Sequence, residues 1–171
     1  FRAAYLLHVE NILLPAPHTQ TPDAESYIAA WTPAARYAQS YGMGLLAAND
    51  AETFLSTDDA LTQVVRGLGK WDCGAVFDGV AYQKTGVYPF FGACYGSHIK
   101  NHFRVLRIGD LHADGTPARL DHGACGLREV ASLLLARSFD GYFSLQSSAL
   151  TETLGGWETL LADTRTMLKT L

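Results

Sequence analysis

Residues 57–78, TDDALTQVVRGLGKWDCGAVFD, contain one helix and one strand of the repeating unit that decides the fold. Apolar residues in its first half recur three and four positions apart, as on a helix with one apolar face, and they are Leu61, Val64, Val65 and Leu68. Ser56 and Asp59 have the spacing of a capping box at the start of that helix. Residues 73–78 form a short, mostly apolar run, which is typical of a strand buried on both faces. The stretch therefore predicts a helix over 57–68 followed by a buried strand.

The same alternation of short apolar runs and amphipathic patterns extends along the whole chain. The apolar runs predict strands at 2–9, 44–49, 73–78, 103–109 and 141–146. The amphipathic patterns predict helices at 23–41, 57–68, 88–100, 127–137 and 156–170. Helical crossovers between buried strands imply an α/β fold with a parallel sheet and helices packed outside it. An open doubly wound sheet and part of a (β/α)8 barrel both fit this order, and both place their chemistry beyond the carboxyl ends of the strands.

Composition and charge narrow the class of protein. The chain has 171 residues, of which 48% are apolar, and this predicts a single domain over residues 1–171. A net charge of −4 gives no signal for a nucleic-acid or membrane partner. No apolar run approaches the roughly 20 residues of a membrane span. Cys73, Cys94 and Cys125 form neither a zinc pattern nor a disulfide framework, so we expect reduced thiols in a cytoplasmic protein.

Polar side chains lie at or beyond the end of each predicted strand. The site candidates among them are His8, Glu10, Asn49, Asp78, Arg107, Asp110, His112 and Gln146. Asp50, Glu52 and Lys84 are further polar residues of the same loops. Because parallel strands end at a shared edge, these side chains would line one pocket. Asp78 and Arg107 stand inside the apolar patterns of their strands, where a charge needs a partner, and both an ion pair and a substrate clamp would supply one.

Five segments in this order resemble the sugar phosphate isomerase/epimerase superfamily, the xylose isomerase-like TIM barrels that also include endonuclease IV. They are YAQSYGMGLLAAND (37–50), FLSTDDALTQVV (54–65), CGAVFDGVAYQKTGVYP (73–89), HIKNHFRVLRIGDLHADG (98–115) and LDHGACGLREVASLLLARSFDGYFSLQ (120–146). The resemblance implies a (β/α)8 TIM barrel of which this chain supplies the last five βα units. We therefore expect the first three units to be missing from this chain, and an open five-stranded parallel sheet if it stands alone.

The resemblance also implies a divalent metal, Mn²⁺, Mg²⁺, Co²⁺ or Zn²⁺, held by Glu, Asp, His and Glu from the last four strands. The corresponding positions here are Ala48, Asp78, Arg107 and Gln146. Only Asp78 keeps a ligand of the superfamily. Arg107 has no lone pair to give to a metal and keeps its positive charge. The sequence therefore predicts a degenerate metal site and does not favour a metal cofactor.

By resemblance, the function would be that of an isomerase, epimerase or lyase of carbohydrate metabolism, with a sugar- or polyol-type substrate. Asp78 would be the surviving catalytic carboxylate, His8 or Glu10 would supply acid–base function, and Arg107 would bind an anionic group of the substrate. The other substrate-binding candidates are Asn49, Asp110, His112 and Gln146. The alternative is a pseudoenzyme: a binding protein, or a subunit that completes a barrel with a second copy or a partner chain.

Overall fold

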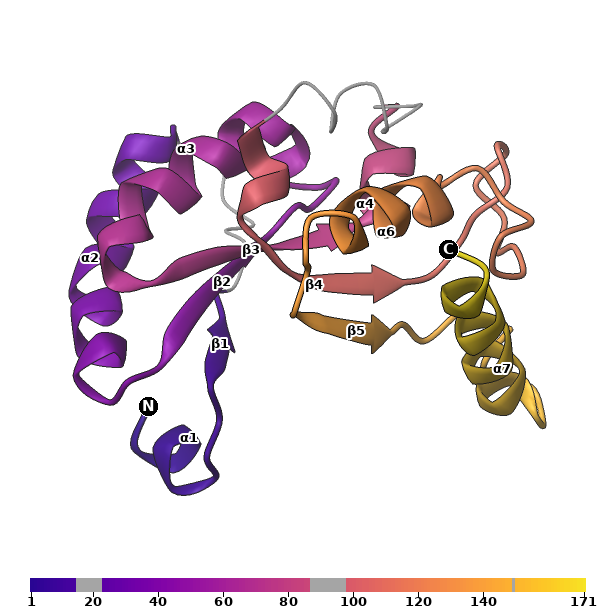
Figure 1. Ribbon diagram of the computed structural model, residues 1–171. Coiled ribbons are helices and arrows are strands. Elements are labelled where there is room, and N and C mark those ends of the chain that lie inside the picture. The colour runs from indigo at the N-terminus through magenta and orange to yellow at the C-terminus, as the bar shows by residue number, and fades with distance from the viewer. Residues whose placement is uncertain (15–22, 87–97, 149) are drawn as a thin grey trace.

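Five parallel strands form one curved sheet in chain order (Figure 1). The computed structural model describes residues 1–14, 23–86, 98–148 and 150–171. The strands are β1 (Asn11–Leu13), β2 (Gly44–Ala48), β3 (Cys73–Asp78), β4 (Phe103–Ile108) and β5 (Tyr142–Leu145). Together they sweep 220° of a barrel, with β1 and β5 at the two edges. The α/β class and the parallel sheet expected from the sequence are confirmed.

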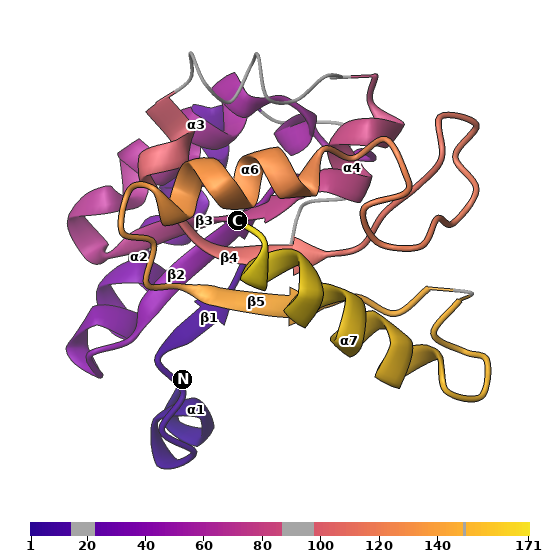
Figure 2. The same ribbon diagram turned by 45° about the vertical axis from the view of Figure 1, so that its right-hand side comes forward.

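Helices connect successive strands and cover the convex face of the sheet, and one further helix lies at each end of the chain (Figures 1 and 2). They are α1 (Arg2–Leu6), α2 (Ala24–Ser40), α3 (Asp58–Leu68), α4 (Gly79–Lys84), α6 (Leu127–Leu135) and α7 (Gly156–Lys169), with short 3-10 turns at Phe54–Ser56, Gly69–Trp71 and His98–Asn101. The hydroxyl of Thr57, rather than the predicted Ser56, caps α3 by accepting a bond from the N–H of Ala60 at 3.2 Å. No helix within the described ranges has the length and apolar character that a membrane crossing requires.

The prediction of a strand over residues 2–9 is wrong. Residues 2–6 form α1, and the first strand begins only at Asn11. Alanine and leucine favour a helix, and a short apolar run has no period that separates the two structures. Phe1 packs edge-on against Tyr37, and the ring of Tyr5 packs against that of Tyr41, which attaches this segment to the end of α2. The predicted helix over 88–100 lies largely outside the described residues.

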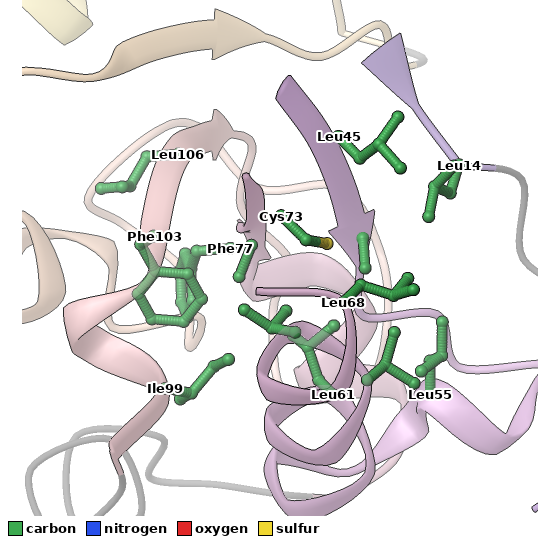
Figure 3. Packing of buried hydrophobic residues seen from close by; sticks show 14 of the residues in the cluster. Leu14, Leu45, Leu55, Leu61, Leu68, Cys73, Phe77, Ile99, Phe103 and Leu106 are labelled. Carbon is green, nitrogen blue, oxygen red and sulfur yellow. The ribbon is translucent and has the colours of Figure 1, made fainter. Parts of the chain in front are cut away.

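The main core lies between the convex face of the sheet and the helices. Figure 3 shows side chains from β2, β3 and β4, such as Leu45, Phe77 and Leu106, gathered with Leu61 and Leu68 of α3. Successive side chains of a strand point to opposite faces, so the intervening residues face the concave side. There a small apolar cluster forms, and it consists of Leu46, Ala48 and Val76 with Val105 against them. The sheet thus separates a helix-covered core on its convex face from an interior on its concave face.

Arg104 and its neighbours occupy the concave side at the amino-terminal end of the sheet. The pairing of β3 with β4 is irregular at this residue, since Val76 pairs with Val105 directly after Ala75 pairs with Phe103. The side chain crosses Gly44 and Gly74, where a Cβ would lie 2.7 and 2.5 Å from its atoms. Its guanidinium pairs with Asp72 and approaches the amide oxygen of Asn11 at 3.4 Å. Polar groups therefore close this end of the interior, and glycine is required beneath them.

Candidate functional site

Asp78, Arg107 and Gln146 come together at the carboxyl ends of β3, β4 and β5. Asp78 is the last residue of β3, and its register partner on β4 is Arg107. Gln146 directly follows β5, and its N–H continues the ladder by donating to the carbonyl of Ile108 at 3.0 Å. The adjacent residues Phe77 and Leu106 face the helix-covered core, so strand alternation directs Asp78 and Arg107 to the concave side. Searching the sequence for polar residues at the ends of predicted strands thus selected three residues that lie together in the structure.

The carboxylate of Asp78 is the centre of this cluster. Its Oδ2 accepts hydrogen bonds from Nη1 of Arg107 at 3.0 Å and from Nε2 of Gln146 at 2.8 Å. Its Oδ1 accepts the N–H of Ala81 at 3.1 Å and so caps α4. The side chain of Asp78 is 7% exposed and that of Arg107 is 28% exposed. A carboxylate at this depth needs such compensation, because water no longer solvates its charge.

Asn49, predicted to bind substrate, holds the backbone of Asp78. Its Nδ2 donates to the carbonyl of Asp78 and its Oδ1 accepts the N–H of the same residue, each at 2.8 Å. Asn49 is 2% exposed and follows the end of β2. This paired contact ties two neighbouring strand ends together and sets the position from which the Asp78 side chain projects. Asn49 also lines the adjoining cavity.

Asp110 organises the loop after β4 rather than presenting an open carboxylate. Oδ1 accepts the N–H groups of Leu111 and Cys125, at 3.0 and 3.1 Å. Oδ2 accepts those of Asp121 and Gly123, at 3.1 and 3.0 Å. Four backbone donors around one buried side chain hold the two ends of the loop 111–125 together. His112 lies in this loop, exposed to solvent and outside the cavity lining.

His8 and Glu10 lie at the opposite end of the sheet from Asp78. Because the first strand starts at Asn11, both residues precede the strand that they were expected to follow. His8 is exposed after α1, and Glu10 accepts a hydrogen bond from the hydroxyl of Tyr142 at the start of β5. The structure therefore does not bring either residue to the Asp78 cluster. The error in the strand's position is the cause.

A cavity of about 440 Å³ opens beside the cluster. Its polar lining includes residues beyond the ends of β2, β3 and β5, namely Asp50, Glu52, Lys84 of α4, Ser147 and Ser148, in addition to Asn49, Asp78, Arg107, Asp110 and Gln146. Both charge signs and several hydroxyls therefore face one small space. The sequence reasoning did not select Ser147 or Ser148, although their position directly after Gln146 was a signal for them. Leu14 and Ala48 supply apolar parts of the wall.

The side chains at the four positions that the sequence resemblance assigns to a metal do not fit a divalent cation. Ala48 has no donor atom, Arg107 brings a positive charge, and Gln146 directs its amide N–H to Asp78. Both oxygens of the remaining carboxylate already accept hydrogen bonds. Over the part of the chain that is described, no three His, Cys, Asp or Glu side chains are grouped so as to hold a metal ion. The donor set is suited to an ion pair.

Comparison with known proteins supports the fold. No protein-family profile matches the sequence, and no curated protein matches it significantly. Solved structures do match, with coverage of 97–99% of this chain. The probable 3-DHS dehydratase AsbF, involved in petrobactin synthesis, from Bacillus anthracis has a TM-score of 0.76 at 13% identity, with 67% of its chain covered. A xylose isomerase domain protein from Planctomyces limnophilus has a TM-score of 0.71 at 13% identity, with 59% covered.

A D-tagatose 3-epimerase-like protein gives a TM-score of 0.69 at 15% identity, again with 67% of its chain covered. At this identity the likeness concerns the fold: five strands and their helices match part of a xylose isomerase-like TIM barrel. The chain spans 59% of the Planctomyces limnophilus protein and 67% of the other two. The half-barrel that the sequence resemblance implied is thereby confirmed.

Proposed function

We propose that this chain, a xylose isomerase-like half-barrel in its fold, binds a small sugar- or polyol-type ligand with an anionic group and uses no divalent metal. The observation that carries the proposal is the engagement of Asp78 by Arg107 and Gln146. A guanidinium 3.0 Å from the only remaining ligand carboxylate supplies a fixed positive charge where the resemblance implies a metal. A dication placed there would be repelled by Arg107 and would have to displace its hydrogen bond.

Arg107 is the proposed receptor for the anionic group. Its Nη1 is used by Asp78, and the guanidinium has further N–H donors on Nε and Nη2 that suit a carboxylate or phosphate. The side chain lines the cavity and is 28% exposed, so a ligand can reach it. Because Asp78 fixes the guanidinium in place, little side-chain entropy is lost when an anion binds. Lys84 adds a second positive charge to the lining.

The remaining lining supports recognition of hydroxyl groups. Asp50 and Glu52 supply acceptors, and Ser147 and Ser148 supply hydroxyls that both donate and accept. A volume of about 440 Å³ is in the range of small-molecule sites. Binding is preferred here to isomerase, epimerase or lyase chemistry. Proton transfer needs an acid or base positioned at the reacting carbon of the substrate. His8 and Glu10, which were predicted for that role, lie at the other end of the sheet, and Asp50, Glu52 and Lys84 of the lining are assigned here to ligand contacts.

Calorimetric titration with sugar phosphates, aldonic acids and the parent neutral sugars, in the presence of EDTA, tests the proposal. We expect an anionic member of the panel to bind, and Arg107→Gln and Arg107→Lys to weaken it at least tenfold. Arg66→Gln, an exposed arginine on α3, is the matched control and should leave binding unchanged. Circular dichroism of each variant establishes that it is folded. Stoichiometric Mn²⁺, Mg²⁺, Co²⁺ or Zn²⁺ in the purified protein, or binding that requires one of them, overturns the proposal.

A second candidate function, as one part of a larger barrel, is favoured by the open edges of the sheet. Among the described residues, no strand pairs with the outer edge of β1 or β5. Apolar side chains are exposed near both edges, including Leu6, Leu7 and Leu13 on one side and Trp157 and Leu161 on the other. Unpaired parallel edges with apolar neighbours are surfaces for another polypeptide.

The arc of the sheet suggests what that polypeptide would supply. Five strands sweep 220°, which leaves 140° open, or room for about three more strands at the same curvature. A second copy of this chain would bring another 220°, so a segment with three βα units fits better than a homodimer. Light scattering coupled to size-exclusion chromatography tests this candidate. A folded, monodisperse monomer that binds ligand by itself would contradict the need for a partner, and a closed dimer would favour the second copy.

A further inference from the structure

A second cavity, of about 240 Å³, lies between the loop after β4 and the connection from β5 to α7. Four leucines contribute to its walls, and they are Leu120, Leu150, Leu154 and Leu160. It shares Gly109, Asp110, Gln146 and Ser148 with the cavity that Arg107 lines. The two cavities are therefore neighbours, and Gln146, whose amide also bonds Asp78, belongs to the lining of both.

The polar groups around the second cavity are satisfied by the protein itself. The hydroxyls of Thr151, Thr153 and Thr159 donate to the carbonyls of Ser148, Leu150 and Gly155, at 2.7 to 2.9 Å. Arg119 and Asp163 form two hydrogen bonds of 2.7 Å with one another. These threonine hydroxyls are engaged by the backbone, and the charges of Arg119 and Asp163 offset one another. The wall therefore has apolar chemistry despite its polar residues.

Two of the leucines face water. Leu154 is fully exposed and Leu150 is 42% exposed, whereas Leu120 is buried. A single exposed leucine is ordinary, but several around one concave space form a surface that water solvates poorly. A space of about 240 Å³ is larger than an apolar cavity of about 150 Å³ that is known to accept benzene. An aryl ring or a short alkyl chain matches both its size and its lining.

We propose that this cavity is a subsite for an apolar substituent of the same ligand whose anionic part lies at Arg107. The placement of the ligand's anionic part rests on the proposed function, and the placement of its apolar part rests on the leucine-lined wall. The ligand class is thus a bipartite one: an anionic, hydroxyl-bearing head joined to an aryl or short alkyl group. Gln146 and Ser148, which belong to both cavities, mark the place where the two parts of such a ligand join.

Methyl phosphate and phenyl phosphate are the probes, because they share an anion and differ in the apolar group. Phenyl phosphate should bind about tenfold more tightly, the gain expected from burying one ring face. The double variant Leu150→Ser/Leu154→Ser should remove that difference and leave the affinity for methyl phosphate unchanged. Leu135→Ser, which alters a comparably exposed leucine on α6, is the control and should preserve the difference. Equal affinities for the two phosphates in the native protein overturn the subsite.

Benzyl alcohol separates failure of the subsite from failure of the anion site. In NMR titrations this neutral probe should give nuclear Overhauser contacts to the methyl groups of Leu150 and Leu154, with or without the Arg107→Gln substitution. If neither phosphate binds but these contacts are present, the Arg107 site fails and the apolar subsite stands. If benzyl alcohol contacts none of the leucines of the second cavity, the subsite is wrong whatever the phosphates do.

Discussion

The side-chain amide of Asn49 forms two 2.8 Å hydrogen bonds with the backbone of Asp78, one from its Nδ2 to the carbonyl and one to its Oδ1 from the N–H. An amide is the side chain that can donate and accept in this paired geometry at once. It lies at the ends of two neighbouring strands, so the contact determines where the Asp78 carboxylate stands relative to Arg107. The site thus depends on a residue whose own polar atoms are turned to the backbone.

Replacing Asn49 should destabilise the fold and loosen the site together. Asn49→Ala leaves a buried N–H and a buried carbonyl without their partner, so the free energy of unfolding should fall by about 2 to 4 kcal/mol. Asn49→Asp should be at least as damaging, because a carboxylate cannot donate to the carbonyl of Asp78. Urea unfolding measures both variants, with Asn101→Ala at an exposed position as the control. A change below about 0.5 kcal/mol for Asn49→Ala would contradict a structural role.

Asp110→Asn should loosen the loop 111–125 without unfolding the sheet. The carboxylate accepts four backbone N–H groups, and an amide nitrogen in place of one oxygen would face two of those donors. We expect a loss of about 2 to 4 kcal/mol in local stability. Hydrogen exchange at the amides of Asp121, Gly123 and Cys125 should accelerate accordingly. Asp114→Asn, at the exposed tip of the same loop, should change the exchange rates of these three amides much less.

Glu10 and Tyr142 should affect stability and not ligand binding. Their hydrogen bond joins the residue before β1 to the start of β5, at the end of the sheet away from Arg107. Tyr142→Phe and Glu10→Gln should each lower the free energy of unfolding only slightly, because water competes for both groups of this exposed pair. Affinity for the anionic ligand should stay within twofold of the native value in calorimetry. A tenfold loss of affinity in Glu10→Gln would instead support a place for Glu10 in the site, where the sequence predicted it to supply acid–base function.

Alkaline pH should destabilise the protein through two thiols. Burial raises the pKa of Cys73 and of Cys125 from 9.0 to about 12. Above pH 9 the unfolded chain releases these protons while the folded chain retains them, so the free energy of unfolding falls as pH rises from 9 toward 12. The slope should approach about 1.4 kcal/mol per pH unit for each thiol.

Urea unfolding at pH 8 and pH 10.5 measures this slope. The variant Cys73→Ala/Cys125→Ala should have a flatter dependence than the native chain. Alkylation of native protein at pH 8, followed by mass spectrometry of the two cysteine peptides, should leave both thiols unmodified because they are buried and protonated. Rapid labelling of either thiol, or an unchanged slope in the double variant, would show that burial does not hold these protons.

Local pattern was enough to predict most of the elements. The helix over 57–68 and the strand over 73–78 correspond to Asp58–Leu68 and Cys73–Asp78, since each has a clear period and a marked end. The first strand was misplaced because residues 2–9 carry apolar character without a period, and their structure depends on packing against α2. The helix α4 went unpredicted because it is short and begins at a cap, Asp78, that was interpreted only as a site residue.

The sequence by itself determined the parallel α/β arrangement and placed Asp78, Arg107 and Gln146 at one end of it. These follow from periodicity and chain order, which are local properties. Only the tertiary structure decided what the polar groups do. It joined Asp78 to Arg107 and Gln146, turned Asn49 and Asp110 to the backbone, and placed Glu10 at the far end of the sheet. A buried polar atom must find its partner in space, and several of these partners lie 15 to 68 residues away in the chain.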